Sequence, residues 1–343
     1  MSLVMKVDGD RWRTHLRSVV ASSPGIIPVA KGNGYGFGVG RLARRADWLG
    51  VPTLAVGTYD ELDQATSRFT GDIVVLTPWR PYLPSAVVAL DNASVIHTVG
   101  RMSDLAALSG QRVVIEVATS MRRHGFAPEA VVDALGASAG SRVEAISIHL
   151  PLPGRENADE FARLMRTIAP AARARGVTEV WVSHLTRDQI QATDAQGLTV
   201  RSRIGTELWL GDTGALEVQA AVLDQHPIAR GEVFGYRRRT ARGSGTILIV
   251  SGGTAHGIGL ESPARSLSAR DRAATIARGG LDALGRVRSP FFIGDHQAMF
   301  AEPPHMQSSM LFIPSNAPLV GPGDVVRARV RHTATLFDSV EIS

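Results

Sequence analysis

The sequence predicts an α/β fold in which a (β/α)8 barrel of the TIM type is followed by a mostly β C-terminal domain. Eight short apolar runs rich in β-branched residues recur between residues 10 and 212, and helix-period segments separate them. Strands separated by helices of that length run parallel, and eight of them favour a closed barrel. An open doubly wound sheet is the structural alternative. After residue 212 the pattern changes to strands joined by turns rich in Gly and Pro.

The predicted barrel elements alternate regularly, and we place the barrel domain at residues 10–212. Its strands are short apolar runs, as expected for parallel strands buried on both faces: residues 26–30, 53–57, 72–77, 94–98, 112–118, 143–149, 179–183 and 198–203. Its helices repeat apolar residues at the α-helical period: residues 10–21, 39–49, 59–67, 102–108, 128–137 and 158–175.

The β-rich domain is predicted to comprise residues 213–343 together with residues 1–9. Strands are expected at residues 216–222, 245–251, 309–313 and 325–330. The turn Gly321-Pro322-Gly323-Asp324 before the last of them has the residue types that tight turns favour. One helical segment, residues 263–284, lies inside this domain and leaves its topology open.

Composition narrows the class of protein. The chain has 343 residues, a formal net charge of +5 and no cysteine, which excludes disulfides and thiolate metal sites and fits a cytoplasmic enzyme. It contains no apolar stretch long enough to span a bilayer and no signal-peptide pattern, so no membrane partner is expected. The densest arginine cluster, residues 237–239 with Arg242, is not interleaved with aromatic residues, so no nucleic-acid partner is expected.

A lysine at the end of the first predicted barrel strand is the leading candidate for chemistry. The apolar run 26–30 ends at Lys31, and a glycine-rich turn follows at residues 32–38. Partial desolvation at the rim of a sheet lowers the pKa of an amine and makes it a usable nucleophile toward an aldehyde. The glycines let the backbone approach a ligand, and Tyr35 offers a hydroxyl to the same space. The alternative is a flexible turn with a solvated lysine.

Other polar groups follow the ends of later strands. In a parallel barrel these ends meet on one face, where active sites form. The groups are one amine, two imidazoles, two guanidiniums and one carboxylate: Lys31, His149, His184, Arg123, Arg203 and Glu116. Taken together they suit an anionic, aromatic ligand.

Residues 26–38 resemble the VxKANAYGHG signature of alanine racemases, and the resemblance extends over nearly the whole chain. It implies that Lys31 binds pyridoxal 5′-phosphate (PLP) covalently in a homodimer. Residues 116–126 are similar to the family's KVDTGMxRLGF. That match implies that Arg123 contacts the phenolic oxygen of PLP and the substrate. In many family members a carbamylated lysine holds this arginine, and Glu116 occupies the position of that lysine here. An ion pair between Glu116 and Arg123 is therefore expected.

Residues 146–149 and 203–211 resemble two further segments of the family. The resemblance implies that Arg203 faces the pyridine nitrogen of PLP and that His149 supports it. Because a guanidinium does not give up its proton, the nitrogen would stay unprotonated and the cofactor would be a weaker electron sink. This argues against the amino-acid decarboxylases of the same fold, which use a carboxylate there.

The phosphate of PLP would be held at the ends of three strands. By the resemblance its ligands are Tyr35 and the backbone N–H groups of Gly205 and Thr206. The serine that binds the phosphate in the family has no good match here, because its position aligns near Arg187-Asp188. Thr186 is the substitute that we predict.

The C-terminal domain resembles the family with larger departures. Residues 231–236 look like GexVgYG and residues 303–310 like RVSMDQxM. The second match implies that the backbone N–H of Met306 reaches the substrate carboxylate of the partner subunit. Gln307 replaces an aspartate of that motif.

The second base expected of a racemase is missing. Racemisation on PLP ordinarily needs an acid–base group on each face of Cα. The family's second base is a tyrosine in a GYADG motif, delivered across a dimer interface, but the aligned residues 251–259 contain no tyrosine. Thr254 takes its place with a hydroxyl that is too weak an acid unaided. His256, two residues away, is the candidate substitute, or else a structural turn histidine.

Three functions are compatible with these residues. The first is a PLP-dependent amino-acid racemase that abstracts the Cα proton of an amino acid joined to the cofactor, with Lys31 and either His256 or Thr254 as acid–base groups. The second is a PLP-dependent D-amino-acid lyase or aldolase, for which His256, His296 and His305 are conceivable metal ligands, although their spacing matches no tight metal motif. The third is a non-catalytic PLP-binding protein.

Overall fold

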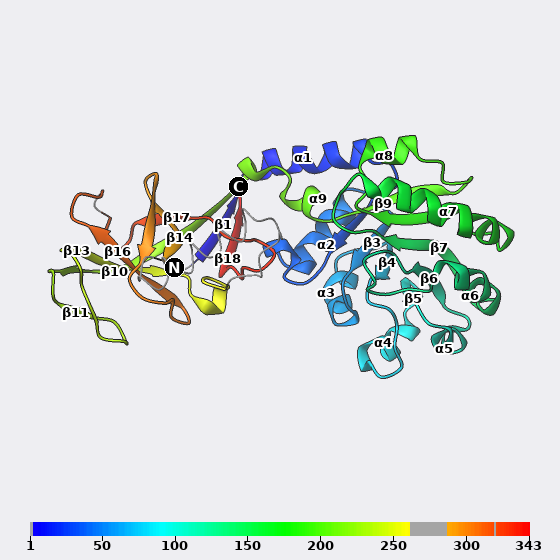
Figure 1. Ribbon diagram of the computed structural model, residues 1–343, viewed down its shortest axis with the longest axis horizontal. Helices are drawn as coiled ribbons and strands as arrows, with labels where there is room; N and C mark the ends of the chain where they lie inside the picture. The colour runs from blue at the N-terminus through cyan, green and yellow to red at the C-terminus, as the bar shows by residue number, and fades with distance from the viewer. Residues whose placement is uncertain (1–2, 261–286, 319) are drawn as a thin grey trace. The chain divides into compact units, whose positions relative to one another are not determined.

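The computed structural model describes residues 3–260, 287–318 and 320–343. The chain divides into two compact units, Arg13–Gly211 and Met1–Trp12 with Asp212–Ser343 (Figure 1). The helix expected at residues 263–284 lies outside the described residues. No helix in the described ranges combines the length and the apolar character that crossing a bilayer requires.

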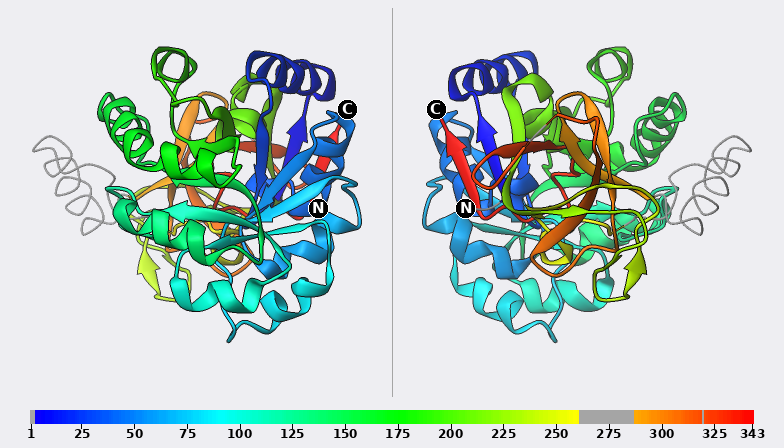
Figure 2. Two further views of the ribbon diagram at one scale, coloured as in Figure 1. Left: turned by 90° about the vertical axis from the view of Figure 1, so that its right-hand side faces the viewer. Right: turned by 90° about the vertical axis from the view of Figure 1, so that its left-hand side faces the viewer.

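The first unit is a closed barrel of eight parallel strands, which confirms the predicted fold. The strands follow the barrel wall in sequence order, and β2 closes it by pairing with β9 through Ile27 and Arg203. Figure 2 shows the helices outside the ring of strands. The strands are β2 (Ile27–Ala30), β3 (Thr53–Val56), β4 (Asp72–Val75), β5 (Val95–Val99), β6 (Arg112–Val117), β7 (Arg142–His149), β8 (Glu179–Ser183) and β9 (Thr199–Ile204).

The helices before and between these strands vary widely in length. The longest, α7 (Glu156–Ala174), buries an apolar face that includes Phe161, Met165 and Ile168. The others are α1 (Gly9–Ser22), α2 (Val39–Trp48), α3 (Leu62–Thr66), α4 (Pro84–Val88), α5 (Met102–Leu105), α6 (Val131–Ala137), α8 (Arg187–Ala192) and α9 (Thr206–Leu210). Helices α4, α8 and α9 were not predicted.

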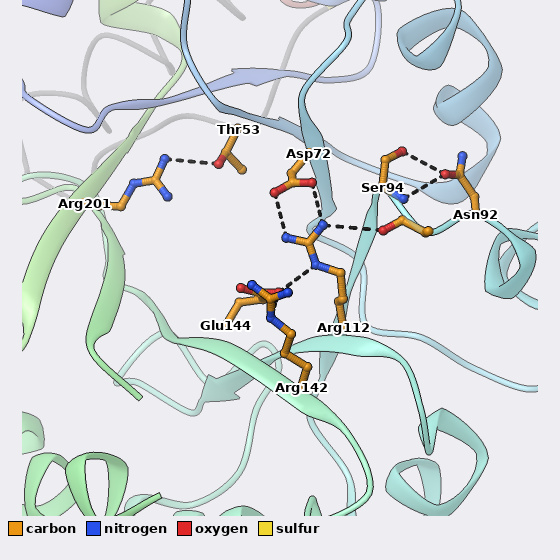
Figure 3. Close-up of polar contacts among 9 residues, drawn as sticks. Thr53, Asp72, Asn92, Ser94, Arg112, Arg142, Glu144 and Arg201 are labelled. Atoms are coloured by element: carbon orange, nitrogen blue, oxygen red, sulfur yellow. Dashed lines mark hydrogen bonds and ion pairs between the residues drawn. The ribbon is translucent and has the colours of Figure 1, made fainter. Parts of the chain in front are cut away.

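Charged residues tie together the amino-terminal ends of the barrel strands (Figure 3). Arg112, the first residue of β6, donates from Nη2 to Asp72 Oδ2 at 2.6 Å and from Nε to Glu144 Oε1 at 2.6 Å. Arg201 donates to Thr53 Oγ1 at 3.1 Å and to Glu179 Oε2 at 3.2 Å. These bonds join strands that lie far apart in the sequence, at the end of the barrel opposite the predicted site.

The second unit is mostly β, as predicted, and it contains both ends of the described chain. Its eight-stranded sheet has the order β13-β16-β15-β14-β17-β10-β1-β18, and β13 also pairs with β10. Strand β1 pairs antiparallel with β10 and parallel with β18. The strands are β1 (Leu3–Val7), β10 (Leu216–Ile228), β13 (Gly245–Ser251), β14 (Arg288–Ile293), β15 (His296–Phe300), β16 (Ser308–Pro314), β17 (Val325–Ala328) and β18 (Ser339–Ile342); a hairpin adds β11 (Val233–Phe234) and β12 (Arg239–Thr240).

Strand β10 extends six residues beyond its predicted end at Val222. Its register against β13 shifts between Val222 and Asp224, so the alternation of buried and exposed residues is interrupted there. The pattern that marks a strand in the sequence stops at this irregularity, while the hydrogen-bonded pairing continues to Ile228.

Candidate functional site

The mouth of the barrel carries a row of polar side chains above an apolar layer. That layer fills the barrel interior with Ile27, Val29, Ala55, Val74, Ile96, Val114, Ala145 and Trp181. Side chains alternate between the two faces of a strand, so residues two positions further along face the same interior. The residues two positions beyond this layer include four polar ones: Lys31, Glu116, Ser147 and Ser183. Arg203 is at the corresponding position of β9.

Arg203 is buried and fixed by three hydrogen bonds. It donates from Nη1 to Ser147 Oγ at 2.7 Å, from Nε to Ser183 Oγ at 3.2 Å and from Nη2 to the carbonyl oxygen of Ile148 at 2.9 Å. The Glu116 carboxylate accepts a hydrogen bond from Ser147 and lies 3.9 Å from Arg203 Nη1. Residues of β7 and β8 therefore fix the position of the Arg203 guanidinium, and Glu116 of β6 balances its charge.

Glu116 lies at ion-pair distance from Arg203, 3.9 Å from its Nη1, rather than from Arg123. Glu116 lies inside the barrel wall, whereas Arg123 is an exposed residue of the loop beyond β6. A glutamate side chain is shorter than the carbamylated lysine it was expected to replace, and its oxygens stay with Ser147 and Arg203. Burial raises the pKa of Glu116, while Arg203, Ser147 and, more weakly, Arg123 oppose that rise.

Lys31 keeps a solvent-accessible side chain at the mouth, but nearby protein atoms remove part of the water around its amine. Burial lowers the pKa of Lys31, and the positive charges of Arg123 and Arg203 lower it further, against an opposing effect of Glu61. A lowered pKa increases the fraction of neutral, nucleophilic amine. The structure thus brings Lys31, Arg123 and Arg203 into one electrostatic group.

Glu61 was not predicted as a site residue. It ends the 3-10 turn Tyr59–Glu61 and accepts hydrogen bonds from the backbone N–H of Gly32 at 2.7 Å and of Gly57 at 2.6 Å. It thereby fixes the residue that follows Lys31 to the end of β3. The sequence pattern that could have identified Glu61 is a capping box, in which Thr58 is followed three residues later by this glutamate.

Tyr35 and Gly205 form a close contact at the predicted phosphate position. Tyr35 is buried in the left-handed region with φ 55°, and a Cβ added to Gly205 would lie 1.9 Å from the Tyr35 hydroxyl oxygen. Burial, with a smaller effect of Glu61, raises the pKa of Tyr35 to about 12, so its hydroxyl remains a donor at neutral pH. Glycine at 205 is what allows this hydroxyl to reach the backbone that leads to Thr206.

Thr186 and His149 each have partners within the protein. Thr186 caps α8, and its hydroxyl oxygen accepts from the backbone N–H of Gln189 at 3.2 Å. Burial, followed by Arg203 and Arg123, lowers the pKa of His149 to about 2, so its imidazole is neutral. The hydrogen bonds of Arg203 go to Ser147, Ser183 and Ile148 rather than to the His149 ring.

The loop that carries Arg123 is anchored by a residue from a distant helix. Glu160 of α7 accepts from the backbone N–H and from the hydroxyl of Ser120, each at 2.6 Å. Thr119 donates to the carbonyl oxygen of His149 at 2.7 Å. Glu160 had no local sequence signal, because its partner lies forty residues earlier in the chain.

In the second unit, His256 is locked in a structural arrangement. Its Nδ1 accepts from the backbone N–H of Gly253 at 3.2 Å, and its Nε2 lies 3.2 Å from the carboxylate of Asp338. An imidazole that accepts at one nitrogen and donates at the other has no free lone pair for a substrate proton. This geometry favours the structural turn histidine over the catalytic one. Thr254 begins the same 3-10 turn and is exposed.

Met306 lines a cavity of about 680 Å³ together with Thr254, Tyr236, Glu302 and His305. The predicted substrate contact and the position of the missing tyrosine are therefore on one cavity wall. The three histidines considered as metal ligands do not converge: within the described residues, no group of three or more His, Cys, Asp or Glu is placed to hold a metal ion.

Comparison with known proteins gives matches along most of the chain. A family model for the alanine racemase N-terminal domain matches residues 7–202. The alanine racemase of Mycolicibacterium vanbaalenii is 27% identical over 268 residues, which cover 69% of this chain and 67% of the relative. That of Nitratidesulfovibrio vulgaris is 27% identical over 305 residues, which cover 80% and 79%.

Solved structures show the same fold. The alanine racemase from Bartonella henselae, a structure with covalently bound pyridoxal phosphate, has a TM-score of 0.71 at 16% identity and covers 97% of this chain and 91% of its own. A histidine racemase from Leuconostoc mesenteroides has a TM-score of 0.63 at 17% identity, with 95% and 87% covered. At these identities the likeness establishes the fold alone.

Proposed function

This chain belongs to the alanine racemase family, and from that premise we propose that it is a PLP-dependent amino-acid racemase acting as a homodimer. The observation that carries the proposal is the group of cations at the barrel mouth. Lys31, with its lowered pKa, lies within the electrostatic reach of Arg123 and of the fixed guanidinium of Arg203. One reactive amine among positive charges suits an aldehyde that also carries a phosphate.

The residues at the mouth fit PLP. Lys31 would hold it covalently, Arg203 would hold the pyridine nitrogen and Arg123 the phenolic oxygen. The contact between Tyr35 and Gly205 is a cradle that any larger residue at 205 would fill, and there Tyr35, Gly205 and Thr206 would hold the phosphate. Thr186 remains a proposed phosphate ligand whose hydroxyl hydrogen is not used by its capping role. When bound, PLP would draw electron density from Cα of an amino acid and so acidify its α-hydrogen.

The protein's own groups are arranged for proton transfer. Its lowered pKa increases the neutral fraction of Lys31, whose amine would be able to take or return a proton at Cα. Arg203 cannot act as an acid, and its three hydrogen bonds keep it in place. Glu61 holds the turn after Lys31 against the end of β3, which fixes the backbone from which the Lys31 side chain extends. Met306 and Arg123 are the proposed contacts of the substrate carboxylate.

Borohydride trapping tests the covalent attachment directly. The chain has only two lysines, Lys6 and Lys31, which makes an internal control available. After incubation with PLP and reduction, peptide mass mapping should find the pyridoxyl group on Lys31 and not on Lys6. The variant K31A should lose the label and K6A should keep it. Labelling of neither lysine in the wild type would contradict the proposal.

Proton NMR in heavy water then distinguishes the activities. Amino acids of both configurations are incubated with the PLP-loaded protein. Exchange of the α-hydrogen with inversion at Cα is the expected result for a racemase. Breakdown products would indicate a lyase, and the absence of exchange for every amino acid tried would leave PLP binding without catalysis.

A further inference from the structure

The cavity around Met306 contains an acid, an imidazole and a phenol that touch one another. Glu302 follows β15 and is only 2% exposed. Its Oε1 lies 2.6 Å from His305 Nε2 and accepts from the backbone N–H of Tyr236 at 3.3 Å. The ring of Tyr236 lies over that of His305, with centroids 4.5 Å apart.

The surrounding backbone is shaped to admit this acid. Gly235 has φ 71°, and a Cβ added there would lie 2.3 Å from Glu302 Oε2, so a side chain at 235 would displace the carboxylate. A carboxylate buried to this degree requires strong donors, and the imidazole is the side-chain donor it has among the described residues. Glu302 and His305 are thus held as a pair.

The pairing leaves one ring nitrogen of His305 available. Since Nε2 donates to a carboxylate, the lone pair of the neutral imidazole is on Nδ1. None of the contacts described for His305 engages Nδ1. The side chain of His305 is 26% exposed and lines the cavity, so this nitrogen is accessible to a small molecule there.

The other candidates for a second acid–base group are less suitable. Both ring nitrogens of His256 are engaged, and His149 is neutral with a very weakly basic ring. Thr254, which takes the place of the missing tyrosine, is bound to the loop of His305: its backbone N–H donates to the His305 carbonyl oxygen at 2.8 Å. His305 therefore presents an imidazole beside the position where an acid–base group is missing.

We propose that His305 is the second acid–base residue of the reaction, that Glu302 positions it and that Tyr236 covers it. This inference rests on the proposed racemase function. In one direction, Nδ1 of His305 from one chain of the proposed homodimer takes the α-proton of one enantiomer, and Nζ of Lys31 from the other chain delivers a proton to the opposite face of Cα. In the reverse direction the two groups exchange roles, so one proton is taken and one is given in each turnover.

Exchange measured separately for each enantiomer tests the assignment. In H305Q, solvent deuterium should enter the enantiomer whose α-hydrogen Lys31 takes, without inversion. Exchange from the other enantiomer should fall by about 10²- to 10⁴-fold, the range typical for loss of a general acid–base group. E302Q should slow the same enantiomer by a smaller factor. The control H226Q, which alters the exposed His226–Asp224 pair of the same unit, should leave both rates unchanged.

The outcomes separate this assignment from the function on which it rests. Equal loss for both enantiomers in H305Q, or no loss, would overturn the role of His305 while leaving the racemase intact. Exchange of neither enantiomer by the wild type would overturn both. Borohydride labelling of Lys31 should be the same in all four proteins, which shows that each variant still folds and binds PLP.

A measurement on the apoprotein tests the positioning role without catalysis. Nitrogen NMR should show His305 as the tautomer protonated at Nε2, and E302Q should shift the ring toward a mixture of tautomers. A wild-type ring protonated at Nδ1 would overturn the proposal, because that nitrogen could not accept a proton.

Discussion

The charged side chains at the barrel mouth depend on one another for burial. Glu116 and Arg203 are both buried and lie 3.9 Å apart, and Ser147 bonds to both. Removing one member of such a group leaves an uncompensated buried charge, which costs more than the pair itself contributes. Glutamate at 116 therefore balances the charge of the arginine inside the barrel, while Arg123 is exposed in the loop beyond β6.

Gly205→Ala should disturb the site through Tyr35 alone. The φ of Gly205, −117°, is not in the left-handed region, but the new methyl would lie 1.9 Å from the Tyr35 hydroxyl oxygen and 2.8 Å from Cζ. Overpacking of this kind costs about 1–3 kcal/mol of the free energy of unfolding. Chemical denaturation measures that loss, and PLP titration should show weaker binding.

Two controls make the Gly205 prediction specific. Adding Tyr35→Phe to G205A should restore part of the lost stability, because it removes the atom in closest contact. Gly136→Ala, inside α6 with no atom within 4 Å of the new Cβ, should be neutral or stabilising. Equal losses in G136A and G205A would show that the contact with Tyr35 is not the cause.

At the scale of elements, the arginine at the start of β6 links three strands of the barrel. Arg112→Met should lower the free energy of unfolding by about 1–2 kcal/mol, because Asp72 and Glu144 lose their shared partner while partly buried. Urea unfolding measures this loss, which should shrink as salt is added.

A second arginine that pairs with the Glu144 carboxylate provides a matched control for Arg112→Met. Arg142 lies 3.0 Å from Glu144, but its side chain is 72% exposed. R142A should cost less than about 0.5 kcal/mol, as exposed ion pairs do. Comparable losses for the two variants would contradict a special role for Arg112.

The elements differed in how well the sequence predicted them. The barrel strands were predictable because each is a short β-branched run between helices. Because the strand ends were predictable, Lys31 and Arg203 could be identified as candidate site residues. Strands β1, β14, β15 and β18 and the short hairpin strands β11 and β12 were missed. Strand β1 alternates buried and less buried residues, so it lacks the continuous apolar run that marked the barrel strands.

The partners of the site residues were mostly beyond sequence reasoning. Ser147 binds Arg203 across 56 positions, and Glu160 binds Ser120 across 40, so no local pattern connects them. His305 was considered only as a metal ligand, because its pairing with buried Glu302 depends on how the loop after β15 folds back. The polar residues at the strand ends could be predicted from the sequence. The residues of neighbouring elements that hydrogen-bond to them could not.

For the whole molecule, mixed dimers can show whether Lys31 and His305 act from different chains. K31A and H305Q, each impaired alone, are unfolded together and refolded as a mixture. If each site of a symmetric dimer takes Lys31 from one chain and His305 from the other, half of the dimers are mixed and each has one intact site. Racemase activity should then recover to about a quarter of the wild-type value.

The matched control is a mixture of two variants of one residue. K31A mixed with K31Q should recover no activity, because no combination restores the amine. Failure of the K31A and H305Q mixture to exceed its parents would contradict a site shared between two chains.

The pairing of β1 with β10 and β18 determines the order in which the chain can fold during synthesis. Residues 3–7 leave the ribosome before the barrel sequence, β10 emerges only after that sequence, and β18 emerges after the other described strands. Until then the edges of β1 have no neighbours, and such edges are prone to wrong association. The barrel strands pair with their sequence neighbours in the order in which they are made, except for the closing pair of β2 and β9. Translation therefore completes the barrel before it completes the sheet.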